Sequence, residues 1–166
     1  MTAKRSTKHD HVVFKKWSQF DRLEELTCRP VVKGKRISKS NEVHYLSFFT
    51  GKDEKPAGKF MYFDINTRNK SCEFGYVIDP VRRNTGLGKK MLAECINYLF
   101  KNTDLNKIYC QTASFNTPSV KLLEGLGFKR DGILRRHHEL DGKLWDDYIY
   151  SVLRSEWKYK KGNKKY

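Results

Sequence analysis

The residues best suited to chemistry lie between positions 74 and 91. An apolar stretch ends at Asp79, a loop with Arg83, Gly86 and Gly88 follows, and an apolar periodicity of helical spacing begins directly afterwards. The first N–H groups of a helix have no partners inside the helix, and the helix dipole adds partial positive charge at that end. Glycines let the backbone approach a ligand closely. The pattern predicts a binding site for a phosphate group.

Two common phosphate-binding loops do not fit this segment. A dinucleotide loop, G-x-G-x-x-G, requires a third glycine where the chain has Met91, and a nucleoside-triphosphate loop requires a glycine at a spacing where none stands. A tight strand-to-helix turn that binds nothing is the remaining alternative. Arg83 and the lysines at 89 and 90 favour the anion site.

A second block, residues 116–128, reads Asn-Thr-Pro-Ser-Val-Lys-Leu-Leu-Glu-Gly-Leu-Gly-Phe. It resembles the N-x-x-[AS]-x-x-L-x-E-x-x-G-F helix of the GCN5-related N-acetyltransferase (GNAT) superfamily. The pattern Arg83-x-x-Gly86-x-Gly88 after an apolar strand is similar to the pyrophosphate loop of the same superfamily. The two blocks stand in the expected order, and the resemblance covers about residues 40 to 157.

The resemblance implies acetyl-coenzyme A as co-substrate. It implies that Val77 and Asp79 pair by backbone with the pantetheine arm, and that N–H groups from Arg83 to Lys89 hold the pyrophosphate. Asn116 would contact the pantetheine or thioester end. The residues expected to bind the co-substrate are Val77, Ile78, Asp79, Arg83, Asn84, Thr85, Gly86, Leu87, Gly88, Lys89, Asn116 and Ser119.

Such folds transfer the acetyl group directly to an amine in a ternary complex. The amine must first lose a proton, and we expect Glu73 to act as the base, because partial burial on an apolar strand would raise its pKa. A glutamate on the solvent-facing side of the sheet is the alternative. The N–H of Val77 is expected to stabilise the oxyanion.

The proton donor to the leaving thiolate departs from the usual pattern. Many members of the superfamily carry a tyrosine where this chain has Leu123. Ser119, on the first turn of the same predicted helix, is the candidate catalytic donor. A hydroxyl that only contacts the backbone at the helix start is the alternative interpretation.

The acceptor site is expected to involve the predicted first helix at 17–26, the loop 33–41 and the last hairpin. In that hairpin, residues 137–139 and 145–148 are histidine, aromatic and acidic. Neighbouring residues of a strand face opposite ways, so only about half of these side chains should face a pocket. Residues 132–157 resemble the branch that acetylates ribosomal-protein N-termini, and also bacterial acetylases of nucleotide-linked amino sugars. The resemblance makes Asp147 the family's hairpin carboxylate, and a structural salt bridge is the commonest interpretation of that carboxylate. The expected acceptor is a primary amine on a protein N-terminus, an amino sugar or another small molecule.

The chain is strongly basic, with 34 lysines and arginines against 19 acidic residues and a net charge of +15. This surplus favours an acidic partner, such as the ribosome or a nucleotide-linked substrate, and disfavours polyamines. A basic RNA- or ribosome-binding module without catalysis is the alternative of another class, but the chain has no RNP-type aromatic signature. A basic protein whose charge has no specific role is the third interpretation.

The elements that must position these residues alternate along one predicted domain, 12–157, between basic tails at 1–11 and 158–166. We expect strands at 12–14, 43–50, 58–65, 71–78 and 108–112, helices at 17–26, 87–99 and 117–126, and a hairpin of 132–140 with 144–153. Residues 33–41 are predicted as a loop, and 51–56 as a turn. The fold class is mixed α/β, with a mostly antiparallel central sheet, flanking helices and a splayed strand pair that holds acetyl-CoA.

Four well-separated cysteines without C-x-x-C spacing argue against a zinc site, so no metal is expected, and they suit a reducing cytosol. Cys95 and Cys110 lie in apolar runs and are predicted core residues. No stretch has the length of a membrane span or the pattern of a signal peptide, so we expect a cytoplasmic protein. An exposed strand or the last hairpin could pair two chains in a homodimer.

Overall fold

The computed structural model describes residues 39–40, 43–50 and 56–158. Within these ranges seven strands form one sheet in the order β1-β3-β4-β5-β7-β6, and β2 also pairs with β3. The strands are β1 (Lys39–Ser40), β2 (His44–Phe48), β3 (Gly58–Asn66), β4 (Ser71–Ile78), β5 (Lys107–Ala113), β6 (Lys129–Leu140) and β7 (Lys143–Leu153). All pairings are antiparallel except that of β4 with β5. The predicted mixed α/β class is confirmed.

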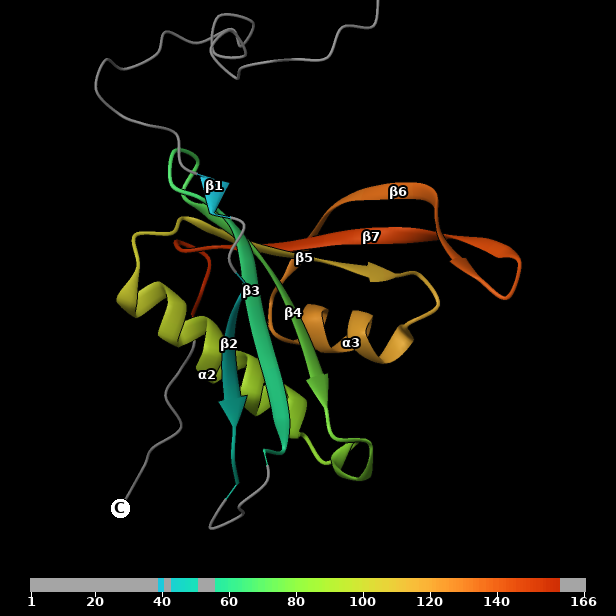
Figure 1. Cartoon of the computed structure of the whole chain (residues 1–166), viewed down its shortest axis with the longest axis horizontal. Helices are drawn as coiled ribbons and strands as arrows, with labels where there is room; N and C mark the ends of the chain where they lie inside the picture. Colours follow the sequence, from blue (N-terminus) through green and yellow to red (C-terminus); the bar gives the residue numbers. More distant parts are fainter. Residues whose placement is uncertain (1–38, 41–42, 51–55, 159–166) are drawn as a thin grey trace, which may run out of the picture. The chain divides into compact units, whose positions relative to one another are not determined.

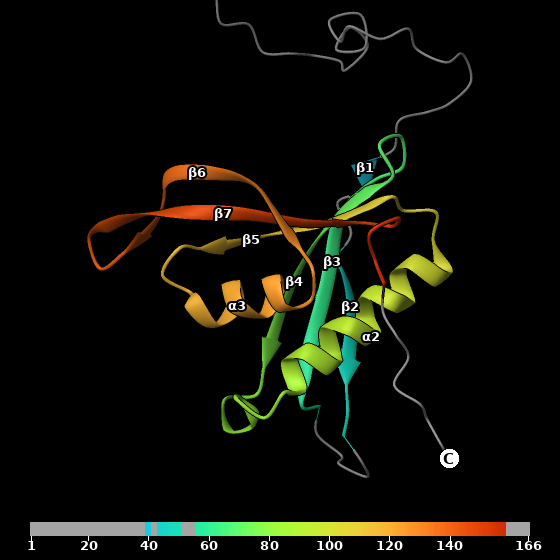
Figure 2. The same cartoon turned by 180° about the vertical axis from the view of Figure 1, so that it is seen from behind.

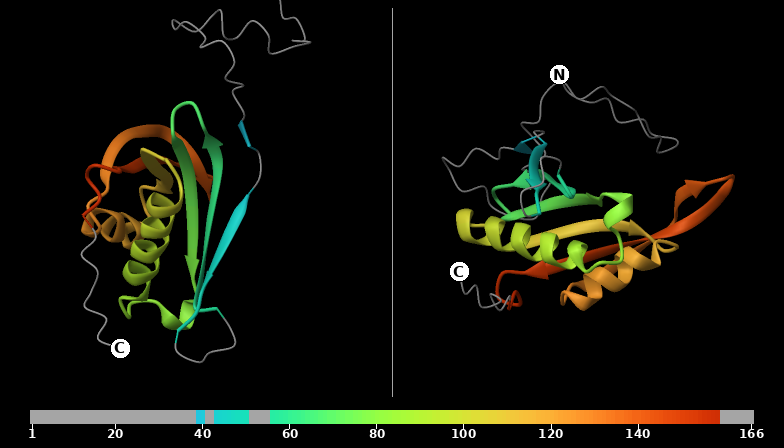
Figure 3. Two further views of the ribbon diagram at one scale, coloured as in Figure 1. Left: turned by 90° about the vertical axis from the view of Figure 1, so that its left-hand side faces the viewer. Right: turned by 90° about the horizontal axis from the view of Figure 1, so that it is seen from below.

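Two helices, α2 (Leu87–Asn102) and α3 (Thr117–Gly125), lie on the same face of the sheet (Figures 2 and 3). A short 3-10 helix, η2 (Pro80–Arg82), precedes α2. The apolar stripe of α2 packs on the sheet because its residues recur every three or four positions. Its buried members are Met91, Leu92, Ala93, Cys95, Ile96, Leu99 and Phe100. Together with Phe60, Phe74 and Tyr150 from the strands they form the core, which confirms the predicted burial of Cys95 and Cys110.

The parallel strands β4 and β5 pair only over Ser71–Glu73 and Lys107–Tyr109. Beyond these residues the two strands diverge (Figure 1). β4 stays paired with β3 as far as Ile78, and β5 stays paired with β7 along its whole length, so each strand follows its other neighbour. The gap therefore opens at the carboxyl ends of both strands. The chain enters α2 after β4 and α3 after β5, so both helix N-termini lie at the same edge.

Most predicted elements are present, with ends shifted by a few residues. The strand β6 begins at Lys129, three residues before the predicted start at Gly132. The predicted loop 33–41 is corrected at its end, because Lys39 and Ser40 form β1 against Asn66 and Ile65. This pairing depends on the distant end of β3, which a local pattern does not report.

Several predictions fall outside the described residues. These are the strand at 12–14, the helix at 17–26, the turn residues 51–55 and both tails except Lys158. None of the described helices has the length and apolar character that a bilayer span requires.

Candidate active site

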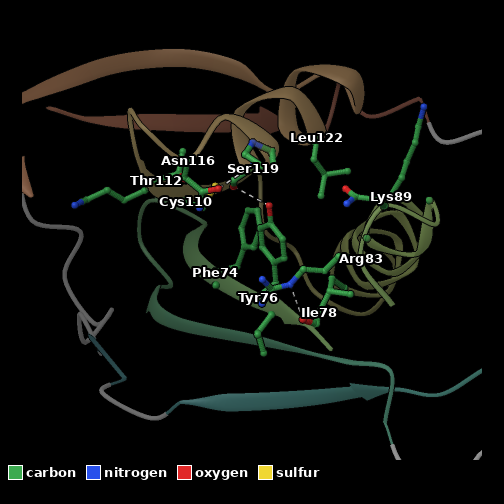
Figure 4. A pocket seen from close by; sticks show the side chains of 17 residues that line it. Phe74, Tyr76, Ile78, Arg83, Lys89, Cys110, Thr112, Asn116, Ser119 and Leu122 are labelled. Carbon is green, nitrogen blue, oxygen red and sulfur yellow. Dashed lines mark hydrogen bonds between the residues drawn. The ribbon is translucent and has the colours of Figure 1, made fainter. Parts of the chain in front are cut away.

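The gap between β4 and β5 forms a cavity of about 630 Å³. It extends from the strands to the first turns of α2 and α3 (Figure 4). Its lining residues are Phe74, Gly75, Tyr76, Val77, Ile78, Arg83, Asn84, Gly86, Gly88, Lys89, Cys110, Gln111, Thr112, Asn116, Pro118, Ser119 and Leu122. The two sequence blocks thus meet around one space.

Most of the predicted co-substrate residues line this cavity: Val77, Ile78, Arg83, Asn84, Gly86, Gly88, Lys89, Asn116 and Ser119. Asp79, Thr85 and Leu87 do not line it. The Asp79 carboxylate accepts from the N–H of Val81 at 3.2 Å, and the Thr85 hydroxyl donates to the carbonyl of Arg82 at 2.8 Å. These two side chains hold the loop in shape, while the predicted co-substrate contacts of both residues would be made by their backbone groups.

The N-terminus of α2 is equipped for an anion. Gly86 is the N-cap, no side chain caps the helix, and the first turn contains no acidic residue. The N–H of Lys90 bonds to the carbonyl of Gly86 at 3.2 Å, so the N–H groups of the three preceding residues have no partner inside the helix. Arg83 and Lys89 add full positive charges at the rim. These N–H groups and positive charges fit the pyrophosphate group that was predicted to bind here.

The two glycines of the loop have different tasks. Gly86 has φ 80°, a left-handed conformation that favours glycine, and its position has open space around it. A Cβ on Gly88 would lie 3.2 Å from Cδ2 of Leu122 and 3.6 Å from Cγ1 of Ile78. Gly86 therefore makes the turn, and Gly88 lets α2 approach α3 and β4 closely.

A hydroxyl pair spans the cavity from β4 to α3. The Tyr76 hydroxyl lies 2.7 Å from Oγ of Ser119, and Figure 4 shows the two side chains pointing at each other. The helix start is capped by Asn116 and not by the Ser119 hydroxyl, because the side-chain oxygen of Asn116 accepts from the N–H of Ser119 at 3.3 Å. The Ser119 hydroxyl thus contacts a side chain in the cavity. Burial raises the pKa of Tyr76, so its hydroxyl keeps its proton at neutral pH.

Tyr76 is not among the site residues predicted from the sequence. The signal was present, because Tyr76 alternates with Phe74 and Ile78 on the apolar face of the same strand. Leu123, at the position where a tyrosine is common in the superfamily, is fully buried in the core and does not line the cavity. The only hydroxyls that line it from β4 and α3, within the described residues, belong to Tyr76 and Ser119.

Backbone alternation decides which N–H groups of β4 face the gap. The N–H of Asp79 donates to the carbonyl of Ala57 at 3.0 Å, on the β3 side. Because successive N–H groups of a strand point in opposite directions, Val77 also directs its N–H toward β3, and Tyr76 directs its own toward β5. The N–H that faces the gap, where the oxyanion would lie, is therefore that of Tyr76, whereas the sequence had suggested that of Val77.

Glu73 lies at the last paired position before the strands diverge, opposite Tyr109 of β5. It is half-buried and does not line the cavity. Phe74 next to it is in the core beneath α2 and α3, so Glu73 faces the other side of the sheet. Its negative charge, after burial, helps to raise the pKa of Tyr109, which places the two side chains near each other.

The last hairpin corrects the prediction that neighbouring histidines must face opposite ways. Three residues of β6, from Arg135 to His137, stand opposite the single residue Asp146 of β7. Arg136 has φ 52°, and its N–H donates to the Asp146 carboxylate at 2.8 Å. This bulge turns both His137 and His138 toward Asp147. Their Nδ1 atoms lie 3.0 Å and 3.4 Å from its two oxygens.

No group of three or more His, Cys, Asp or Glu side chains in the described ranges is placed to hold a metal ion. The partners of the Asp147 carboxylate are two histidines, which form the predicted salt bridge only in their protonated state.

The comparisons with known proteins agree with the geometry. The model of the acetyltransferase (GNAT) domain family matches residues 5–149. An uncharacterized N-acetyltransferase p20 of Bacillus licheniformis is 28% identical over 121 residues, which are 73% of this chain and 68% of that protein. YnaD of Bacillus subtilis, also an uncharacterized N-acetyltransferase, is 28% identical over 59% of this chain but only 55% of its own length.

More distant relatives carry specific names. The [ribosomal protein uS5]-alanine N-acetyltransferase of Escherichia coli is 24% identical, over 78% of this chain and 70% of its own. Among solved structures, a spermidine N-acetyltransferase mutant from Vibrio cholerae has a TM-score of 0.66 at 25% identity, covering 85% of this chain and 79% of that one. With the family model matched over most of its length, the chain belongs to the GNAT family of acetyl-CoA-dependent acetyltransferases.

Proposed function

We propose that the protein transfers an acetyl group from acetyl-CoA directly to a primary amine, within a ternary complex. The divergence of β4 and β5 into a cavity that ends at the uncapped N-terminus of α2 carries the proposal. An elongated thioester can lie in the gap, with its pyrophosphate at the helix start and its acetyl end near Tyr76 and Ser119. The amine would approach from the sheet face that bears Glu73.

The backbone of β4 would bind the oxyanion. As the amine attacks, negative charge develops on the carbonyl oxygen of the acetyl group, and a fixed N–H donor stabilises it more than it stabilises the ground state. The Tyr76 N–H is our candidate donor, because β5 does not pair with β4 at that position.

Arg83 should contribute to the binding free energy of acetyl-CoA and not mainly to the chemical step. The variant Arg83→Gln is expected to raise the Kd for acetyl-CoA about 10- to 100-fold, the effect of one charge-assisted hydrogen bond. Isothermal titration calorimetry measures it. The neighbouring Arg82→Gln is the matched control, since Arg82 does not line the cavity and donates to the hydroxyl of Thr50 at 2.7 Å. Equal losses in both variants would contradict a specific role for Arg83.

Cys110 lines the cavity but should not carry the acetyl group. Burial raises the pKa of its thiol to about 12, so at neutral pH the thiolate is present at only about one part in 10⁵. Cys110→Ala should therefore retain kcat within about threefold, while the small cavity costs about 1–2 kcal/mol of stability. Steady-state kinetics and thermal unfolding check both. An acetylated protein detected by mass spectrometry, absent from Cys110→Ala, would refute direct transfer.

For the acceptor we propose the N-terminus of a protein, with nucleotide-linked amino sugars as the alternative class. The relative that acetylates an alanine of ribosomal protein uS5 supports the first class, and the basic surplus suits a ribosomal or nucleotide-linked partner. Polyamines belong in the test as well. A net charge of +15 repels them at a distance, but Glu73 and Asp147 supply negative charge on the acceptor side.

The decisive experiment is an acceptor screen with released coenzyme A thiol as the readout. It compares peptides with alanine or serine N-termini, nucleotide-linked amino sugars, free amino sugars and spermidine at equal concentration. Release of thiol with at least one amine, and the matching acetylated product by mass spectrometry, is the expected result. If calorimetry detects no binding of acetyl-CoA at micromolar concentration, the proposed acetyltransferase activity is refuted. The basic RNA-binding module then remains, and its affinity for RNA must fall steeply as the salt concentration rises.

We also propose a cytoplasmic location and leave a homodimer as an outcome to be measured. The described cysteines, Cys72, Cys95 and Cys110, are free and buried, as expected in a reducing compartment. The exposed edge of β6, the last strand of the sheet order, is the surface that a second chain would pair with.

A further inference from the structure

We propose that His137, held by the buried carboxylate of Asp147, removes the first proton from the incoming ammonium ion of the acceptor. The proposal rests on the proposed acetyl transfer and adds a residue pair to it. The pair lies on the hairpin of β6 and β7, apart from the co-substrate cavity, and touches that cavity through Gln111.

The hydrogen bonds of Asp147 determine the tautomer of His137. Asp147 is only 2% exposed, and its Oδ2 lies 2.6 Å from Nε2 of Gln111 and 3.0 Å from Nδ1 of His137. Nε2 of Gln111 and Nδ1 of His137 are also 3.0 Å apart. An ionised carboxylate only accepts, so a proton on Nδ1 of His137 can be donated to Oδ2, whereas a lone pair on Nδ1 would face that oxygen and could accept only from Gln111. The carboxylate therefore favours the neutral tautomer with the proton on Nδ1 and a lone pair on Nε2.

His138 completes the surroundings of the carboxylate. Its Nδ1 lies 3.4 Å from Oδ1 of Asp147, an atom that no donor in the described part of the chain hydrogen-bonds. Its ring packs against the edge of Phe115, at 5.3 Å between centroids. The charged and titratable groups around His137 are therefore Asp147 and Asp146 on β7 and Arg135, Arg136 and His138 on its own strand, with neutral Gln111 on β5.

The position of the pair suits an acceptor that comes from the Glu73 side. Antiparallel pairing of β5 with β7 is continuous, and Cys110 and Tyr150 of these strands are in the core. Gln111 and Asp147, at the alternate positions, thus face away from α2 and α3, as Glu73 does. The His137 side chain is 54% exposed, so its Nε2 can reach both an approaching amine and bulk water.

The chemistry requires two proton acceptors at the amine nitrogen. The acceptor arrives as R–NH₃⁺ and gives its first proton to Nε2 of His137, which passes it to water. The nitrogen lone pair then forms the bond to the acetyl carbon, and the carbon–sulfur bond breaks with its electron pair on sulfur. Glu73 takes the second proton from nitrogen, Tyr76 protonates the thiolate, and solvent returns the proton from Glu73 to Tyr76. Each turnover releases one proton.

The test is the pH profile of kcat/KM for His137→Gln, with an alanine-initiated peptide as the amine. The α-amino group of such a peptide has a pKa of about 8, so only about 3% is neutral at pH 6.5. The variant can use only the neutral amine, so its kcat/KM should be up to about 30-fold below that of the wild type at pH 6.5. By pH 9 its kcat/KM should nearly equal the wild-type value. His44→Gln is the matched control, because His44 lies on β2 and outside the cavity lining, and it should stay within about threefold of wild type throughout.

Two results would overturn the proposal. A loss in His137→Gln that is constant with pH would show a structural role, and an equal pH-dependent loss in His44→Gln would remove the assignment to His137. Imidazole nitrogen NMR supplies an arm without turnover: His137 should carry its proton on Nδ1, and Asp147→Asn should abolish that preference. Neutral His137 protonated on Nε2 in the wild-type protein refutes the pair, whereas a failed acceptor screen refutes only the proposed function.

Discussion

Replacing Glu73 by glutamine is expected to lower kcat about 10²- to 10⁴-fold, the usual contribution of a positioned general base. The Kd for acetyl-CoA should change by less than about twofold, because Glu73 lies outside the cavity lining and faces the opposite side of the sheet. Its place at the last paired position of β4 and β5 puts it at the apex of the gap, where the acetyl end would lie. Stopped-flow and steady-state assays with released thiol measure the loss.

Asp64 offers a matched control for this variant. Its carboxylate, like that of Glu73, helps to raise the pKa of Tyr109, but it lies on β3, one strand further from the gap. Asp64→Asn should therefore keep kcat within about threefold of wild type. Unchanged turnover in Glu73→Gln would remove Glu73 from the mechanism. Equal losses in both variants would point to the net charge of this face instead of a single base.

Replacing Tyr76 by phenylalanine is expected to lower kcat about 10²-fold or more, since the ring stays in place and only the hydroxyl is lost. Burial raises the pKa of Tyr76, so the proton is present at every pH below that raised value, including neutral pH, and becomes unavailable only in strongly alkaline solution. The pH profile of kcat for the wild type should accordingly show no decline on the alkaline side near neutral pH. Titration calorimetry should show acetyl-CoA affinity within about threefold of wild type, because binding depends mainly on the loop before α2.

Two further variants test whether the loss in Tyr76→Phe comes from the Tyr76 hydroxyl itself. Ser119→Ala removes the partner 2.7 Å away, and should cost less than Tyr76→Phe because the phenol can still reach the thiolate. Tyr148→Phe is the control, a half-buried tyrosine outside the cavity lining that should retain full turnover. If Ser119→Ala were as damaging as Tyr76→Phe and the double variant no worse, the two hydroxyls would act as one relay. Full activity in Tyr76→Phe would leave the thiolate to depart without a protein donor.

The sequence by itself determined the features that depend on neighbours along the chain. The anion site follows from a strand, a glycine turn and a helix start in immediate succession, so residues 83–89 could be assigned before any fold was known. Gly86 at the turn and Asn116 at the start of α3 follow from the same local rules of helix ends. Helical spacing of apolar residues likewise predicted α2, which buries one apolar face on the sheet.

Only the tertiary structure decided which distant polar groups lie within hydrogen-bond distance of each other. Tyr76 and Ser119 are 43 residues apart and meet because β4 and β5 diverge while α3 packs against the gap. His137 and His138 both reach Asp147 because a bulge opposite Asp146 breaks the alternation that a regular strand would impose. Strand register and bulges are set by pairing between segments far apart in sequence, so a local pattern contains the residues of the site but not their contacts.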